Sequence, residues 1–84
     1  MKLLVEVKSL GLSELMGKRV TFFCMNYIYS GRLVAIDTRQ VKLEDAGIVY
    51  ETGPLSDSKW ADYQKLPHPI FIRLNSVESY MELK

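Results

Sequence analysis

From residue 19 to the C-terminus, the chain is a succession of segments with the two-residue period of β-strands, most of them separated by short polar turns. The period is first clear in "RVTFFCM" (19–25), where Val20 and Phe22 fall on one face. The predicted strands are 19–25, 27–37, 41–51, 70–74 and 76–83. Gly31 and Gly47 lie inside the two middle strands, and a glycine inside a strand typically marks a bulge or a bend. This pattern restricts the chain to a small, mainly antiparallel β fold.

The N-terminal part has a different pattern. Residues 2–8, "KLLVEVK", are compatible with a short strand. The next segment, "SLGLSELMGKR" (9–19), has apolar residues at helical spacing, with Ser9 or Ser13 able to begin a helix and Gly17 able to end it. We therefore expect a short helix of one or two turns before the first long strand.

Residues 52–69 form the other departure from the strand pattern. They hold all three prolines of the chain, including a Gly-Pro pair. Proline has no backbone N–H to donate to a neighbouring strand, so such a segment favours a loop. We expect one long loop here, with a helical turn near Trp60.

The 84 residues are enough for one domain with one core, and we expect a single domain over 1–84. Mostly β structure, short connections and bends in the middle strands favour a small, strongly bent five-stranded antiparallel barrel with a short N-terminal helix. The alternative is a plain α+β sheet with one helix packed across a face.

Charge and cysteine content exclude several classes of protein. The net charge is only +1, so the chain is not a cation that coats nucleic acid by bulk electrostatics. The single cysteine, Cys24, excludes an intrachain disulfide and a multi-cysteine metal site. The apolar runs are too short to span a membrane, and Glu6 and Lys8 interrupt the run that a signal peptide needs. We expect an intracellular, cytoplasmic protein.

Catalytic candidates are few. His68 is the only histidine and lies between two prolines, where a surface position is the favoured interpretation. Cys24 shares a strand face with apolar residues, which favours a small buried side chain over a nucleophile. The acidic group of Glu44, Asp45 and Glu51 lacks ligand spacing, and no phosphate loop or dinucleotide motif occurs. The sequence predicts a protein that is not an enzyme and needs no cofactor or metal.

Two features remain after these exclusions. The last two predicted strands are apolar and carry no lysine in their middle, so their edges are suited to pairing with another chain. If strand four of one copy pairs with strand five of the next, the contact is heterologous and closes a ring or runs on as a filament. Alternatively, both strands are buried within one barrel.

The second feature is a pair of polar turns, "DTRQ" (37–40) and "RLN" (73–75), each at the end of a predicted strand. Each offers a guanidinium and an amide. Arginine stacks on bases and contacts phosphate, while Asn and Gln hydrogen-bond to base edges. The candidate nucleic-acid-binding residues from this pattern are Arg39, Gln40, Arg73 and Asn75.

The segment "LMGKRVTFFCMNYIYSGRLVAIDTRQVKLEDA" resembles the first motif of the Sm and Sm-like (LSm, Hfq-related) proteins. The matching positions are Gly17, Lys18, Val20, Gly31, Leu33, Asp37, Leu43, Glu44, Asp45 and Ala46. The segment "IRLNSVESYMEL" resembles the second motif at Ile72, Arg73, Asn75 and Val77. The two departures are a first turn one residue short, with Gln40 nearest the base-reading position, and Leu74 in the place of a glycine.

The resemblance implies a five-stranded Sm-like barrel whose subunits join strand four to strand five in a closed homo-oligomeric ring that binds single-stranded RNA, or other single-stranded nucleic acid, at the pore. It implies that Asp37 orients the first turn, that Arg39 and Arg73 clamp a base or phosphate, and that Gln40 and Asn75 hydrogen-bond to base edges. Such a ring would act in RNA processing or chaperoning. The alternative function is a ring of the same fold that contacts protein and binds no nucleic acid.

Overall fold

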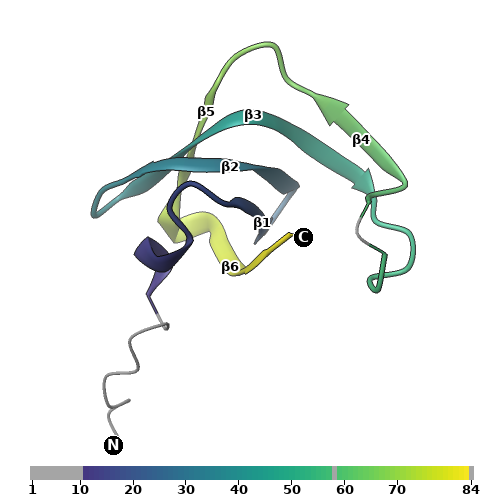
Figure 1. Ribbon diagram of the computed structural model, residues 1–84, viewed down its shortest axis with the longest axis horizontal. Helices are drawn as coiled ribbons and strands as arrows, with labels where there is room; N and C mark the ends of the chain where they lie inside the picture. Colours follow the sequence, from purple (N-terminus) through teal and green to yellow (C-terminus); the bar gives the residue numbers. More distant parts are fainter. Residues whose placement is uncertain (1–10, 58, 84) are drawn as a thin grey trace, which may run out of the picture.

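The predicted strands are present in the computed structural model of the protein, which describes residues 11–57 and 59–83. The elements in chain order are η2 (Leu12–Leu15), β1 (Arg19–Cys24), β2 (Ile28–Ile36), β3 (Gln40–Glu51), β4 (Asp62–Lys65), β5 (Ile70–Arg73), η3 (Leu74–Ser76) and β6 (Val77–Glu82). All neighbouring strands pair in antiparallel orientation. Figure 1 shows β3 as a long arch from which the rest of the sheet bends.

The sheet runs in the order β4-β3-β2-β1-β6, and β5 pairs with the first half of β3 beyond this path. β4 and β5 therefore occupy the same side of β3, one after the other. Among the described residues no strand pairs β4 or β5 with β6, so the expected barrel is not closed. The protein consequently has two open edges, one formed by β4 and β5 and the other by β6 (Figure 1).

The N-terminal helix has one turn, the shorter of the two lengths that we expected, and this turn is a 3-10 helix, Leu12–Leu15. Gly11 precedes the turn and, having no side chain, makes no capping hydrogen bond, so the start of the helix is not stabilised by a cap. Gly17 ends the segment in the left-handed region, with φ of 84°, and its N–H donates to the Leu33 carbonyl at 2.7 Å. The predicted strand at 2–8 and the alternative capping residue Ser9 lie outside the described residues.

The prediction of one loop over 52–69 is wrong in its second half, where β4 forms. Tyr63 in β4 is half-buried and its neighbours are exposed, an alternation too short to stand out in the sequence. Pro67 and Pro69 separate β4 from β5 because neither can donate a ladder hydrogen bond. The described residues around Trp60 form bends and no helical turn. In place of the predicted strand 70–74, the structure thus has two strands along this edge, β4 and β5, with a break between them.

The core lies between the two halves of the bent sheet. Its buried apolar side chains are Val20, Phe22, Leu33, Val41, Leu43, Ala46, Val49 and Ile72. They come from β1, β2, β3 and β5. The buried apolar residues of β1 and of the first part of β3 alternate as the two-residue period predicts, whereas Leu43, Ala46 and Val49 are three residues apart along β3. Two hydroxyls are buried with them, and Thr21 Oγ1 and Ser30 Oγ satisfy each other across β1 and β2 at 3.2 Å.

Gly31 lies at an irregularity in the pairing of β2 with β3, as its place inside the strand predicts. A Cβ atom at this position would lie 2.7 Å from the Ala46 Cβ and 2.9 Å from the Ala46 Cα. Because the second contact is with backbone, the neighbouring strand itself would have to move. The glycine therefore allows β2 and β3 to approach closely where the sheet bends.

We expect Gly31→Ala to lower the free energy of unfolding by about 1–3 kcal/mol, the usual cost of forcing extra atoms into a packed core. The measurement is urea unfolding followed by circular dichroism. Gly11→Ala is the matched control, since a Cβ there meets nothing closer than 3.5 Å. Equal stability of the two variants would contradict a close approach at Gly31.

Among the described residues, no helix has both the length and the apolar character needed to cross a membrane.

Candidate functional site

The two polar turns that the sequence singled out lie next to each other. The first connects β2 to β3, and the second is η3, which follows β5 directly. Pairing of β3 with β5 brings them together, because Gln40 lies opposite Arg73. The Leu74 N–H then donates to the Arg39 carbonyl at 2.8 Å and fixes one turn against the other.

Asp37 organises the first turn. Its Oδ1 accepts hydrogen bonds from the backbone N–H groups of Arg39, at 2.7 Å, and Gln40, at 2.9 Å. These two bonds, the one from Arg39 first, hold the pKa of the carboxyl below its ordinary value of 3.8. The carboxylate is thus engaged with the backbone, and its role is to orient the turn.

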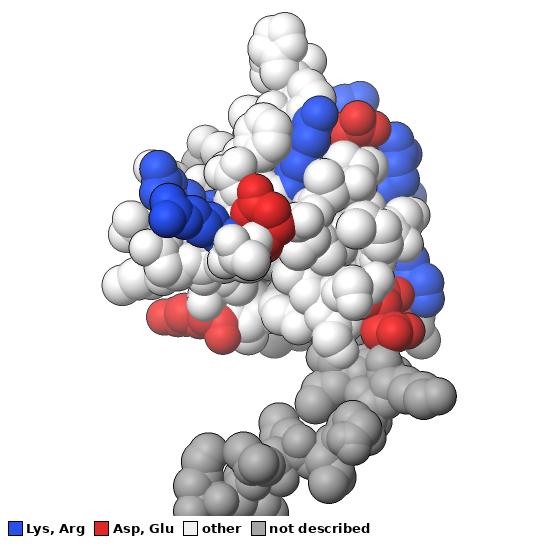
Figure 2. Space-filling view, turned by 90° about the vertical axis from the view of Figure 1, so that its left-hand side faces the viewer, with Lys and Arg blue, Asp and Glu red and all other residues white. Residues whose placement is uncertain are grey.

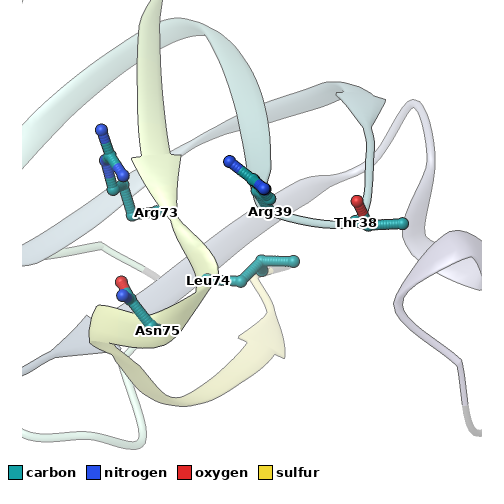
Figure 3. Close-up of a pocket in the computed structure, with 5 residues that line it drawn as sticks. All are labelled: Thr38, Arg39, Arg73, Leu74 and Asn75. Carbon is teal, nitrogen blue, oxygen red and sulfur yellow. The ribbon is translucent and has the colours of Figure 1, made fainter.

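A pocket of about 320 Å³ opens where the turns meet, and five residues line it: Thr38, Arg39, Arg73, Leu74 and Asn75. In Figure 3 the Arg39 and Arg73 side chains extend in the same direction, Asn75 projects from η3, and Leu74 reaches toward Thr38. Neither arginine forms an ion pair with another described residue. This two-turn pocket therefore offers two free guanidinium groups and one amide to a ligand.

The structure separates the five predicted site residues into two groups. Arg39, Arg73 and Asn75 line the two-turn pocket, whereas Asp37 and Gln40 line a neighbouring depression of about 200 Å³. That depression is also lined by Lys42 and Phe71, which were not among the predicted site residues. The sequence could have indicated both residues, because side chains two apart on a strand share a face. Lys42 falls two residues after Gln40, and Phe71 falls two residues before Arg73.

Leu74 stands where the second motif has glycine, and the structure accommodates it. The only non-glycine residue with positive φ among the described residues is Asp45, so Leu74 needs no left-handed backbone. The Leu74 side chain is partly buried and packs against the core, and Leu74 is the first residue of η3. Ser76 ends η3, where its Oγ donates to the Arg73 carbonyl at 2.9 Å. The second turn is therefore stable without a glycine.

Three other titratable residues considered in the sequence are Asp45, Cys24 and His68. Asp45 accepts from Lys65 Nζ at 2.9 Å and from Arg19 Nη1 at 3.0 Å, and Lys65 is the larger cause of its lowered pKa. Burial raises the pKa of the Cys24 thiol, which keeps it protonated at neutral pH. His68 is exposed between β4 and β5. Within residues 11–57 and 59–83, no three His, Cys, Asp or Glu side chains gather as a metal site would require.

The surface charge around the first turn is divided. Figure 2 views this end of the molecule and shows Lys and Arg side chains in separate groups, with acidic side chains between them. A net charge of +1 is consistent with this mixture. Any attraction of an anionic ligand to one copy of the chain is thus local to the cationic side chains that form no ion pair with another described residue, and does not come from a broad basic face.

Because the charged form of Asp37 holds the turn, we expect its contribution to stability to depend on pH. The pKa is lowered in the folded state, so the contribution is full above the ordinary value of 3.8 and is lost as the pH falls through the folded-state pKa. Asp37→Asn keeps an acceptor oxygen but no charge. Urea unfolding at neutral pH should show a less stable variant, and the difference from wild type should disappear in acid. A difference that is independent of pH would contradict this role.

No family model matches the chain, and no curated protein matches it in sequence. Its structure is similar to that of the Sm protein of Pyrococcus abyssii, which was solved in complex with a uridine heptamer. The two chains are 20% identical with a TM-score of 0.60, and the match covers 83% of this chain and 89% of the other. The chain therefore has an Sm-like fold, as the two sequence motifs indicated.

Proposed function

We propose that this protein binds single-stranded RNA at the two-turn pocket, as one subunit of a closed homo-oligomeric ring, and acts in RNA processing or chaperoning in the cytoplasm. The observation that carries the proposal is the meeting of Arg39, Arg73 and Asn75 in one pocket, with both guanidinium groups free of ion pairs to described residues. The uridine heptamer bound to the Sm protein with the same fold supports the choice of ligand.

The chemistry of the pocket suits a nucleotide. A guanidinium is planar, so it stacks on a base or forms paired hydrogen bonds with phosphate oxygens. The Asn75 amide offers both a donor and an acceptor to a base edge. Arg39 and Arg73 extend in the same direction, so a phosphate and a base can be held on one side of the pocket (Figure 3).

The open edges of the sheet support assembly. On one edge, β5 pairs only with β3, and on the other, β6 pairs only with β1, among the described residues. If β5 of one copy pairs with β6 of the next, both rows of free backbone groups are satisfied. A ring would also repeat the two free arginines around its centre, which would make a positive lumen from nearly neutral subunits.

The alternative is a ring of the same fold that contacts protein and binds no nucleic acid. One observation favours it: Leu74 adds an apolar side chain to the lining of the two-turn pocket, where it reaches toward Thr38. The two functions differ in whether the pocket has affinity for RNA at all.

Fluorescence anisotropy of a labelled uridine heptamer distinguishes them. We expect saturable binding at low salt that weakens as salt is raised, because arginine contacts with phosphate release counterions. A double-stranded RNA of equal length is the control and should bind more weakly, since its bases are not available for stacking. Absence of heptamer binding at low salt would contradict the RNA function and leave the protein-binding ring.

A further inference from the structure

The outer face of the sheet beside the two turns carries an aromatic side chain that the core does not explain. Phe71 in β5 is 59% exposed, although it lies in the middle of an apolar strand. It lies opposite Lys42 of β3, and Lys42 Nζ is 5.6 Å from the centroid of the Phe71 ring. A lysine thus covers one face of an exposed ring by a cation–π contact.

Lys42 and Phe71 belong to a larger row of side chains. Residues two apart on a strand share a face, so Gln40 lies on the same face as Lys42, and Arg73 on the same face as Phe71. Gln40 and Arg73 are also direct partners across the two strands. We call these four residues the outer patch. Since Arg73 also lines the two-turn pocket, the patch is continuous with the site of the proposed function.

The charges of the outer patch favour an anionic ligand. Neither Lys42 nor Arg73 forms an ion pair with another described residue. The acidic residue that shares the depression, Asp37, has its Oδ1 occupied by two backbone N–H groups. The next acidic side chain along β3, Glu44, is paired with Arg32 at 3.2 Å. Two free cations therefore flank an exposed aromatic ring.

We propose that the outer patch is a second contact surface for the same single strand of RNA, which reaches it from the two-turn pocket. A base stacks on Phe71, Lys42 moves from the ring to the adjacent phosphate, and the Gln40 amide hydrogen-bonds to a base edge. Stacking on an aromatic ring tolerates any base, because every base has a π face. This inference rests on the proposed function and extends the RNA path from the two turns onto the outer face of the sheet.

In the proposed ring, a neighbouring strand would lie alongside this surface and not over it. A strand that pairs with the free edge of β5 lies in the plane of the sheet, about 4.8 Å from β5, whereas the outer-patch side chains project perpendicular to that plane. The composition also favours RNA over protein, because lysine is depleted in the cores of protein–protein interfaces. An aromatic ring between two cations and an amide instead has the chemistry of a stacking platform for single-stranded nucleic acid.

Binding of two oligouridines tests the proposal: the heptamer, and a probe of twice its length, which has more nucleotides to occupy the outer patch in addition to the turns. Phe71→Leu keeps an apolar strand residue and removes the aromatic face. We expect it to weaken binding of the longer probe by about tenfold, the effect of one lost stacking contact, and to change heptamer binding less. Tyr50→Leu is the matched control, because Tyr50 is 58% exposed and lies at the other end of β3.

Two further measurements identify the cause of any loss. Photo-crosslinking of an iodouracil-substituted longer probe should label the peptide that contains Phe71. The oligomer mass of Phe71→Leu should equal that of wild type. Unchanged affinity of Phe71→Leu for the longer probe overturns the outer patch while leaving the two-turn pocket intact. A changed oligomer mass overturns it as well, because Phe71 is then a subunit contact, and absence of all binding by wild type overturns both proposals.

Discussion

Replacement of Arg39 and Arg73 together by alanine is expected to lower the affinity for a uridine heptamer by about a hundredfold. Each guanidinium makes charge-assisted contacts worth about 1.5–3 kcal/mol, and about 1.4 kcal/mol corresponds to a tenfold change in affinity. Both side chains line the same pocket and are exposed, so their removal leaves the core intact. Fluorescence anisotropy measures the loss.

The matched control removes two positive charges elsewhere. Lys18 and Lys59 are exposed, and neither lines the two-turn pocket, so Lys18→Ala/Lys59→Ala has the same net charge as the arginine variant. We expect it to bind the heptamer with nearly wild-type affinity. The arginine variant should also show a shallower dependence of affinity on salt, because it makes fewer phosphate contacts. Equal losses in both variants would show that only net charge matters, which contradicts a specific pocket.

If the protein forms the proposed ring, replacement of Tyr80 by proline is expected to leave it as monomers. The Leu83 N–H donates to the Arg19 carbonyl, and N–H groups along a strand alternate in direction. The Tyr80 N–H, three residues earlier, therefore points away from β1 toward the open edge of β6. Proline removes that donor and places its ring where the neighbouring strand would pair. Light scattering should report the mass of one chain at micromolar concentration.

Tyr80→Ala is the control for this experiment. The Tyr80 ring lies 5.8 Å from the Phe22 ring, so both variants lose this packing, but alanine keeps the backbone N–H. We expect the alanine variant to be less stable than wild type and still assembled. Circular dichroism should show that the proline variant remains folded. If the proline variant keeps the wild-type mass, the open edge of β6 is not a subunit contact.

The alternation of side chains was enough to predict most of the sheet. Val20, Phe22, Leu33 and Leu43 are buried where the two-residue period puts them, and the strand bounds differ from the predicted ones by only a few residues. Gly31 also marked the irregularity correctly, because only a residue without a Cβ fits against Ala46. Local spacing of apolar residues therefore determines the strands and their buried faces.

What the sequence did not predict depends on contacts between distant segments. The four residues of β4 gain their place by pairing with the second half of β3, and the local pattern of Asp62–Lys65 is too short to indicate this. Whether the barrel closes likewise depends on which strands pair with each other, and the local pattern of one strand does not determine its partner. The helix at Leu12–Leu15 has one turn, within the one or two turns that its apolar spacing predicted, but it is of the 3-10 type, which the spacing does not indicate.

The candidate site was predicted only in part, again because its residues come together from distant segments. Arg39, Arg73 and Asn75 could be chosen because arginines and amides in turns are uncommon enough to notice, and the fold brings these three into one pocket. Lys42 and Phe71 were not chosen, because within their strands they look like ordinary members of an alternating pattern. Their pairing across β3 and β5 became apparent only when the register was known.

Native mass spectrometry of the full chain mixed with the uridine heptamer tests the central claim most directly, because one spectrum reports both assembly and ligand. The proposal predicts a single closed oligomer that carries bound heptamer, and loss of that heptamer from Arg39→Ala/Arg73→Ala with the oligomer unchanged. A monomer would contradict the ring. An oligomer of defined mass with no bound RNA would contradict RNA binding and favour the ring that contacts protein.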